Sequence, residues 1–265
     1  MSLIRRLTAE GSGSLLLAAT VIGSGIMAER LAAGNTAVAL LANTAATVAM
    51  LAVLISLFAP LSGAHFNPAV SLVQALRRAL PWPEAGAYAL VQILGCCLGA
   101  FLAHAMFALP WLQPSLHVRT GAAQWLSEGV ATFGLLLIVL GHRRQSDAPW
   151  MVAAWIGAAY WFTASTSFAN PAITIARSLS DTFAGIRPHD VPMFIIAQLT
   201  GALSALCLAR YLFANAADTA NNVANPIDKG RHHDQVRDRD HRLACRSDDA
   251  LSLPTAHDEE AQRSS

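Results

Sequence analysis

The sequence predicts an all-α membrane protein, with six transmembrane helices and two re-entrant half-helices that form an inverted repeat. The composition is the first reason: 54% of the 265 residues are hydrophobic and only 13% are charged, about half the charged share of a typical soluble domain. Long stretches without any charged residue are the second. The third is the tripeptide Asn-Pro-Ala, which occurs at residues 67–69 and again at residues 170–172.

The charged residues separate a membrane body from a polar tail. Of the 35 charged residues, 17 lie in the last 52 positions, from 214 to 265. We therefore expect a membrane body over residues 1–213 and a disordered tail over residues 214–265. Neither part has the concentrated basic face that nucleic-acid binding needs, so no nucleic acid is expected as a partner.

The charge-free stretches predict where the chain crosses the bilayer. A spanning helix needs about 20 apolar residues. We expect such helices near residues 12–31, 36–59, 85–108, 122–141, 150–168 and 191–212. Seven arginines in the short connections lie on the side of the N-terminus and four on the opposite side, which predicts that both termini are cytoplasmic.

Each Asn-Pro pair marks a break in the chain followed by the start of a new helix. Asparagine is a favoured helix N-cap, and proline is favoured at the first helical position. The apolar segments that begin at Pro68 and Pro171 are too short to cross a bilayer. We therefore expect both to be half-helices that enter the membrane and leave it on the same side.

The two halves of the body, residues 5–110 and 120–213, repeat each other. Glu10 and Gln92 in the first half are echoed by Glu128 and Gln198 in the second. Three spans per half place the second copy upside down in the membrane. Inverted repeats of this kind carry a site at the midplane, between the halves.

At that midplane the N-termini of the two half-helices are expected to meet. Each helix N-terminus carries about half a positive charge, so the pair raises an electrostatic barrier to cations and protons. Asn67 and Asn170 can each cap a half-helix through the side-chain oxygen and present the amide nitrogen to a passing molecule. The predicted central site consists of Asn67, Pro68, Ala69, Asn170, Pro171 and Ala172.

These motifs, together with the segments 62–70 and 197–198, resemble the aquaporin (major intrinsic protein) family over roughly residues 5–213. The resemblance implies an aquaporin-like fold and a homotetramer in the lipid bilayer, with one pore in each subunit. It implies a passive channel for water or small uncharged solutes, without an enzymatic reaction or a cofactor. It also implies that Glu10 and Glu128 are buried acids that brace the re-entrant loops, and that His65 lines the inner pore.

The resemblance places a selectivity filter at Thr47, Ala158, Ser167 and Ile173. The family usually has an arginine at the last of these positions, often with an aromatic residue and a histidine at others, and none of the three occurs here. The pattern therefore predicts a wide constriction that passes bulky neutral solutes. Arg177, one helical turn beyond Ile173, is expected in the outer vestibule; the alternative is an ion pair with Asp181 on a solvated helix end.

The run from Asn170 to Ile186 resembles a bacterial branch of the family that is associated with arsenic resistance. That resemblance implies uncharged trivalent arsenic as a solute and the bacterial plasma membrane as the location. Within the same class, a glycerol or water channel is the alternative. From other classes, an ion-coupled transporter and a non-conducting scaffold remain open, because inverted repeats also serve transporters.

An enzymatic function finds no support in the body of the sequence. We find no nucleophile with a neighbouring base, no phosphate-binding loop and no metal-ligand spacing among the four cysteines at positions 96, 97, 207 and 245. We therefore expect no catalytic residues, no bound metal and no cofactor.

Overall fold

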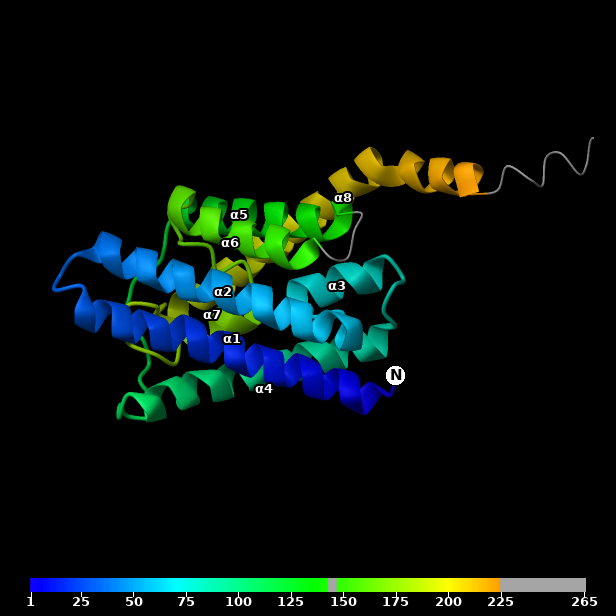
Figure 1. The fold of residues 1–265 in the computed structure, drawn as a ribbon. Coiled ribbons are helices and arrows are strands. Elements are labelled where there is room, and N and C mark those ends of the chain that lie inside the picture. Colours follow the sequence, from blue (N-terminus) through cyan, green and yellow to red (C-terminus); the bar gives the residue numbers. More distant parts are fainter. Residues whose placement is uncertain (143–146, 225–265) are drawn as a thin grey trace, which may run out of the picture. The chain divides into compact units, whose positions relative to one another are not determined.

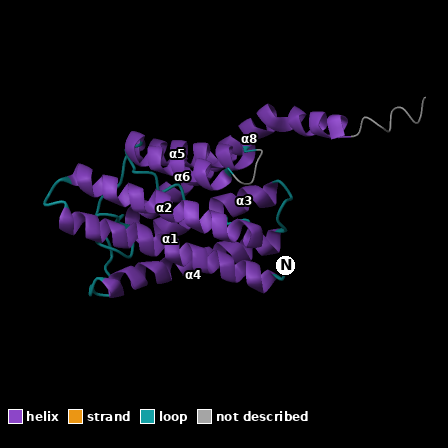
Figure 2. Cartoon of the chain, viewed as in Figure 1, coloured by secondary structure: helices purple, strands orange, loops and turns teal. Residues whose placement is uncertain are grey.

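The computed structural model describes residues 1–142 and 147–224, and over these ranges it contains helices and no β-strand (Figures 1 and 2). Residues 1–212 form one compact unit. The helices are α1 (Leu3–Leu31), α2 (Thr36–Ser62), α3 (Pro68–Leu76), α4 (Trp82–Met106), α5 (Ala122–Gly141), α6 (Ala148–Phe162), α7 (Pro171–Arg177), the short 3-10 helix η1 (Pro188–Asp190) and α8 (Val191–Ala224).

Among the described residues, five segments are long and apolar enough to cross a membrane: α1, α2, α4, α5 and the stretch from Pro188 to Phe213. The helix α6 has 15 residues and ends at Phe162, whereas the sequence predicted a span over 150–168. The Ser/Thr-rich segment that follows leaves the helical conformation, with positive φ angles at Thr166 and Ser167. The all-α membrane fold is confirmed, and the predicted end of this fifth span is wrong by about six residues.

The two half-helices, α3 and α7, occupy different halves of the compact unit. Figure 1 shows α3 beside the end of the bundle where the chain begins, and α7 further toward the opposite end. Each begins at the proline that follows a capping asparagine. The chain therefore reaches the middle of the bundle twice, once from each end.

Close helix contacts in each half depend on glycine. A Cβ atom added at Gly99 of α4 would overlap the Leu15 carbonyl of α1, and one added at Gly201 of α8 would overlap the Gly129 carbonyl of α5. Helices that pack this closely gain van der Waals contact, which drives association where no water is present. The inverted repeat therefore extends from the motifs to the helix packing.

The last described helix runs beyond the predicted body. Residues 214–224, which the sequence assigned to a disordered tail, continue α8 as far as Ala224. This segment is rich in alanine, a strong helix former, and the first proline after it is Pro226. The rest of the predicted tail, including Cys245, lies outside the described residues.

Candidate functional site

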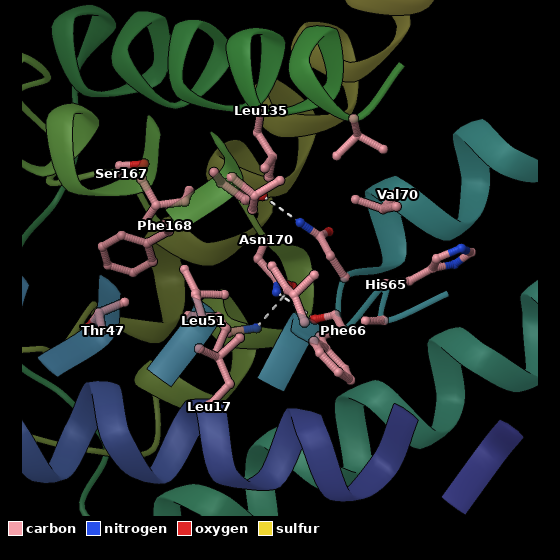
Figure 3. Close-up of a pocket in the computed structure, with 18 of the residues that line it drawn as sticks. Leu17, Thr47, Leu51, His65, Phe66, Val70, Leu135, Ser167, Phe168 and Asn170 are labelled. Carbon is pink, nitrogen blue, oxygen red and sulfur yellow. Dashed lines mark hydrogen bonds between the residues drawn. The ribbon is translucent and has the colours of Figure 1, made fainter. Parts of the chain in front are cut away.

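A cavity of about 280 Å³ lies inside the compact unit, between the two re-entrant loops and the helices around them. Side chains from α1, α2, α5 and α6 form much of its wall, and Figure 3 shows the loops meeting at its centre. The polar residues along it are Thr47, Tyr160, Ser167 and Arg177 toward one end, Asn67 and Asn170 in the middle, and His65, Gln74 and His142 toward the other end. We call these ends the Arg177 end and the His142 end.

The two asparagines at the centre are held in the same way. The Asn67 side-chain oxygen accepts a hydrogen bond from the Ala69 backbone N–H (2.9 Å), and the Asn170 oxygen accepts one from Ala172 (2.9 Å). Each oxygen therefore caps its own half-helix, as the sequence pattern indicates. This use of the oxygen leaves the amide nitrogen of each side chain to face the opposite loop and the cavity.

Each amide nitrogen crosses to the backbone of the other half. Asn67 donates to the Ala169 carbonyl at 2.8 Å, and Asn170 donates to the Phe66 carbonyl at 2.7 Å (dashed in Figure 3). Phe66 and Ala169 both have φ angles of 48°, in the left-handed region that non-glycine residues rarely adopt. This backbone conformation directs their carbonyls toward the partner asparagine, so the strain is part of the central site.

Glu10 of α1 supports the re-entrant loop that precedes α3. Its carboxylate accepts hydrogen bonds from the Ser62 hydroxyl (2.6 Å) and from the backbone N–H groups of His65 (2.9 Å) and Phe66 (2.7 Å). The Gln92 amide adds a fourth at 2.8 Å. Every partner is a donor, so the acceptor-only carboxylate is fully used where it is completely buried.

Glu128 supports the second loop in a similar way, with two backbone N–H groups and a glutamine amide as donors. It accepts hydrogen bonds from the backbone N–H groups of Phe168 (2.8 Å) and Ala169 (2.9 Å), and from the Gln198 amide (2.6 Å). Gln198 also donates to the Thr174 hydroxyl at 2.9 Å, as Gln92 does to Ser71 at 3.1 Å. The buried acids therefore hold the left-handed backbone that positions the central carbonyls.

Three of the four predicted filter residues line the cavity, namely Thr47, Ser167 and Ile173. Ala158 does not: it is exposed on the opposite face of α6, so its assignment to the filter is wrong. The cavity-facing residues of α6 recur every fourth position, at 148, 152, 156 and 160. Tyr160 takes the place expected for Ala158, because the segment between α6 and Asn170 is two residues shorter than the counting assumed.

Tyr160 joins the polar side of the Arg177 end. Its hydroxyl lies 3.3 Å from the Thr47 hydroxyl, which also donates to the Asn43 carbonyl at 2.9 Å. Sequence reasoning missed this tyrosine, although the four-residue spacing of Val152, Ile156 and Tyr160 places all three on one face of α6. The Arg177 end therefore has one aromatic hydroxyl that the motif count did not include.

Arg177 is buried, with 2% of its surface exposed, and it lines the cavity. Its Nε–H donates to the Ala184 carbonyl, and its guanidinium carbon lies 3.4 Å from the centre of the Phe168 ring. The alternative ion pair with Asp181 is wrong: none of the ion pairs among the described residues joins the two side chains, and the Asp181 carboxylate accepts the Leu116 backbone N–H at 2.9 Å. Arg177 is thus a buried wall of the cavity and not a solvated helix end.

His65 lies toward the His142 end, where sequence reasoning missed both His142 and Gln74. The Nδ1 atom of His65 is 3.0 Å from the Ser71 hydroxyl, and its ring meets Tyr88 edge-on at 5.3 Å. His142 follows the last residue of α5 and has its Nδ1 atom 3.1 Å from the Ile138 carbonyl. In the sequence, the position of His142 at the end of a charge-free stretch is the signal that marks it as a mouth residue.

The described residues contain no group of three or more His, Cys, Asp or Glu side chains that are placed to hold a metal ion. What the cavity offers is a path with hydroxyl, amide and guanidinium donors along an otherwise apolar wall. Such a surface can replace the hydration of a small polar molecule that passes through it.

Comparisons with known proteins agree on one family. Residues 1–162 match the family model described as "Major intrinsic protein". The chain is 57% identical over 216 residues to "Aquaglyceroporin AqpS" of Rhizobium meliloti (strain 1021), a match that covers 81% of this chain and 92% of the relative. It is 28% identical over 243 residues to "Probable aquaporin AqpM" of Archaeoglobus fulgidus, covering 80% of this chain and 98% of the relative.

A solved structure has the same fold. The X-ray structure of the aquaglyceroporin from Plasmodium falciparum matches with a TM-score of 0.61, over 82% of this chain and 100% of the other, at 19% sequence identity. At that identity the match shows the fold alone.

Proposed function

The chain belongs to the major intrinsic protein family, and on that premise we propose that it is a passive channel for uncharged solutes of about glycerol size, with arsenous acid among them. The family consists of membrane channels, so solutes move down their own gradients. A channel of this kind in a cell that makes trivalent arsenic internally would therefore let it out.

Ile173 is the observation that carries the proposal. Its side chain lines the cavity and is 4% exposed, at the position where the family usually has an arginine. An isoleucine there contributes neither a charge nor a hydrogen-bond donor, and it is less extended than arginine. The resulting pore suits a solute that is wider than water and carries carbon or arsenic beside its hydroxyl groups.

Arsenous acid fits this pore for chemical reasons. It is uncharged at neutral pH and presents three hydroxyl groups, much as glycerol does. The run from Asn170 to Ile186, with its resemblance to the arsenic-associated branch, also supports it. An uncharged polyol-like molecule does not meet the central barrier that repels cations.

The surroundings of the channel form part of the proposal. We place it in the bacterial plasma membrane as a homotetramer with a pore in each subunit, and with both termini in the cytoplasm. The arginine count in the short connections supports this orientation. The Arg177 end of the cavity then opens to the outside and the His142 end to the cytoplasm.

Stopped-flow light scattering on proteoliposomes tests the proposal, with osmotic water flux, glycerol flux and arsenous acid flux measured on the same preparation. We expect glycerol and arsenous acid to enter well above the rate of protein-free liposomes. Fast water without solute flux would return the chain to the water channels. No flux of any kind would favour a non-conducting scaffold, and solute flux that depends on an ion gradient would favour a transporter.

A further inference from the structure

We propose that Arg177 and Phe168, which lie outside the four filter positions, form a displaced charged filter in this pore. In this arrangement Arg177 supplies the fixed positive charge and the hydrogen-bond donors that Ile173 lacks, one helical turn further out, and Phe168 supplies the aromatic wall. The inference rests on the proposed channel function and names the residues that set its selectivity.

The charge of Arg177 is not neutralised where it lies. A guanidinium keeps its proton under all ordinary conditions, and Arg177 forms no ion pair with any carboxylate among the described residues. Its Nε–H donates to the Ala184 carbonyl, while Nη1 is buried and has no hydrogen-bond partner among the residues that the structure describes. A buried donor without a partner is costly, so a solute oxygen that comes within hydrogen-bond distance of it is a favourable partner.

Phe168 holds this guanidinium in place. The Arg177 guanidinium carbon lies 3.4 Å from the ring centre, and Phe194 meets the ring edge-on at 5.2 Å. The Phe168 backbone N–H is bound by Glu128, so the ring is fixed by both the main chain and its neighbours. Figure 3 shows the ring between Thr47 and Ser167, where it lines the cavity.

A second arginine strengthens the positive potential of the same region. The Arg119 guanidinium carbon lies 5.0 Å from the centre of the Phe168 ring, and its N–H groups donate to the Gly185 and Ser165 carbonyls. Asp190 accepts the Arg119 backbone N–H and pairs with the Arg187 side chain, 2.9 Å away. Arg119 does not itself line the cavity. It therefore raises the electrostatic potential at the Arg177 end without contacting a solute.

The polar groups around Phe168 indicate which solutes this filter takes. The Ser167 hydroxyl is also buried without a partner among the described residues, and Ser167 lines the cavity together with Thr47 and Tyr160. The Phe168 ring and Ile173 add apolar surface. A small neutral molecule with adjacent hydroxyl oxygens on one side matches this combination, whereas a cation meets an unneutralised guanidinium.

The displacement reconciles a wide pore with cation exclusion. An arginine at position 173 would reach into the path, beside the central asparagines. At position 177 the side chain starts about 6 Å further along the helix axis, and its contact with Phe168 holds it against the wall. The positive charge of Arg177 then remains at the pore wall, and the pore stays as wide at Ile173 as an isoleucine allows.

The test compares three variants in proteoliposomes: Arg177→Gln, Arg177→Lys and Arg30→Gln. Lysine keeps the charge and glutamine removes it, which separates charge from packing. Arg30 is a matched control, because it stacks on Phe107 at 5.1 Å and lies outside the cavity. Proton flux is read with an entrapped pH dye at a clamped potential, and glycerol and water fluxes by light scattering.

We expect the ratio of proton flux to glycerol flux to rise about tenfold or more in Arg177→Gln, since one unit charge is removed from the path. Arg177→Lys and Arg30→Gln should keep the wild-type ratio. A wild-type ratio in a folded Arg177→Gln channel would overturn the inference, as would an equal rise in Arg177→Lys. Failure of the wild-type protein to conduct any solute would instead refute the proposed function.

Phe168→Leu provides a second, independent test if Arg177→Gln does not fold. Leucine removes the aromatic ring and leaves Arg177 unchanged, so the guanidinium loses its cation–π contact. We expect the glycerol-to-water flux ratio to change at least about threefold, because small shifts of an orienting group have effects of this size or larger. An unchanged ratio would show that the ring is not part of the filter.

Discussion

The Asn67 amide nitrogen lies 2.8 Å from the Ala169 carbonyl oxygen, on the other side of the inverted repeat. The bond from Asn170 to Phe66 returns the contact at 2.7 Å. Each amide nitrogen has two hydrogens, and one of them is used in this crossing bond. The second hydrogen of each side chain remains for the solute, and the crossing bonds fix the direction in which it is offered.

Replacing Asn67 by aspartate tests this arrangement. Aspartate is an equally good N-cap, but it cannot donate to the Ala169 carbonyl and adds a negative charge beside that oxygen. We expect glycerol flux per folded channel to fall about tenfold or more. Light scattering on proteoliposomes with a known protein content measures it, and Asn170→Asp should behave alike because its contacts are equivalent.

Asn35→Asp is the control for this change. Asn35 caps α2 through the same side-chain oxygen, is exposed, and makes no crossing bond. Its variant should conduct as the wild type does. Wild-type glycerol flux in both central variants would show that the crossing bonds have no part in conduction.

Glu10→Gln should destabilise the protein. Glutamine offers one acceptor oxygen and one NH2 group, so at least one of the four donors around Glu10 loses its partner and another meets a second donor. An unsatisfied buried group costs about 1–3 kcal/mol. We expect a lower thermal unfolding temperature in detergent, read from the fluorescence of the tryptophans.

The matched change is Glu84→Gln. Glu84 pairs with Arg6 at 2.7 Å, and both side chains are about a quarter exposed. A partly exposed pair contributes about 0–1 kcal/mol, so this variant should unfold near the wild-type temperature. Equal unfolding temperatures for the two glutamine variants would argue against a bracing role for Glu10.

Gly99→Ala should also destabilise the protein, because the added Cβ atom would overlap the Leu15 carbonyl and separate α1 from α4. Gly86→Ala lies on the same helix with open space around it, so it should be neutral or stabilise by up to about 1 kcal/mol. Thermal unfolding of both variants in one detergent measures the difference. A stable Gly99→Ala protein would mean that the two helices are not this close.

The correction at α6 gives a further prediction. Tyr160→Ala should widen the Arg177 end and remove the hydroxyl beside Thr47, so the ratio of glycerol flux to water flux should change. Ala158→Leu places a larger side chain on the exposed face, away from the cavity, and should leave this ratio unchanged. The opposite pattern would restore Ala158 to the filter.

Much of the site follows from the sequence because the motif repeats. Glu10, Gln92 and Asn67 have counterparts of the same residue type at equivalent positions in the second half. Equivalent positions in a repeat predict equivalent contacts. The re-entrant half-helices follow from the Asn-Pro breaks and the shortness of the segments after them. The fold class needs no more than this and the charge-free stretches.

The Arg177 end of the pore did not follow in the same way. Tyr160 was missed because a count from Asn170 assumes a fixed loop length, and the loop here is shorter. Arg177 was expected in the outer vestibule, with an ion pair to Asp181 on a solvated helix end as the alternative. Its distance from Ile173 along the helix says nothing about its contacts with Phe168 and Ala184. The spacing of residues within one helix does not predict which residues of other segments their side chains contact.

The central claim, a pore that is wide at Ile173, is tested most directly by the variant Ile173→Arg, with Ile173→Val as the conservative control. Glycerol and arsenous acid fluxes are compared with water flux in proteoliposomes for both variants and the wild type. We predict fast solute entry for the wild type and for Ile173→Val, and a loss of solute flux in Ile173→Arg while water still passes. Undiminished glycerol entry in a folded Ile173→Arg channel, or a wild-type protein that passes water alone, would contradict it.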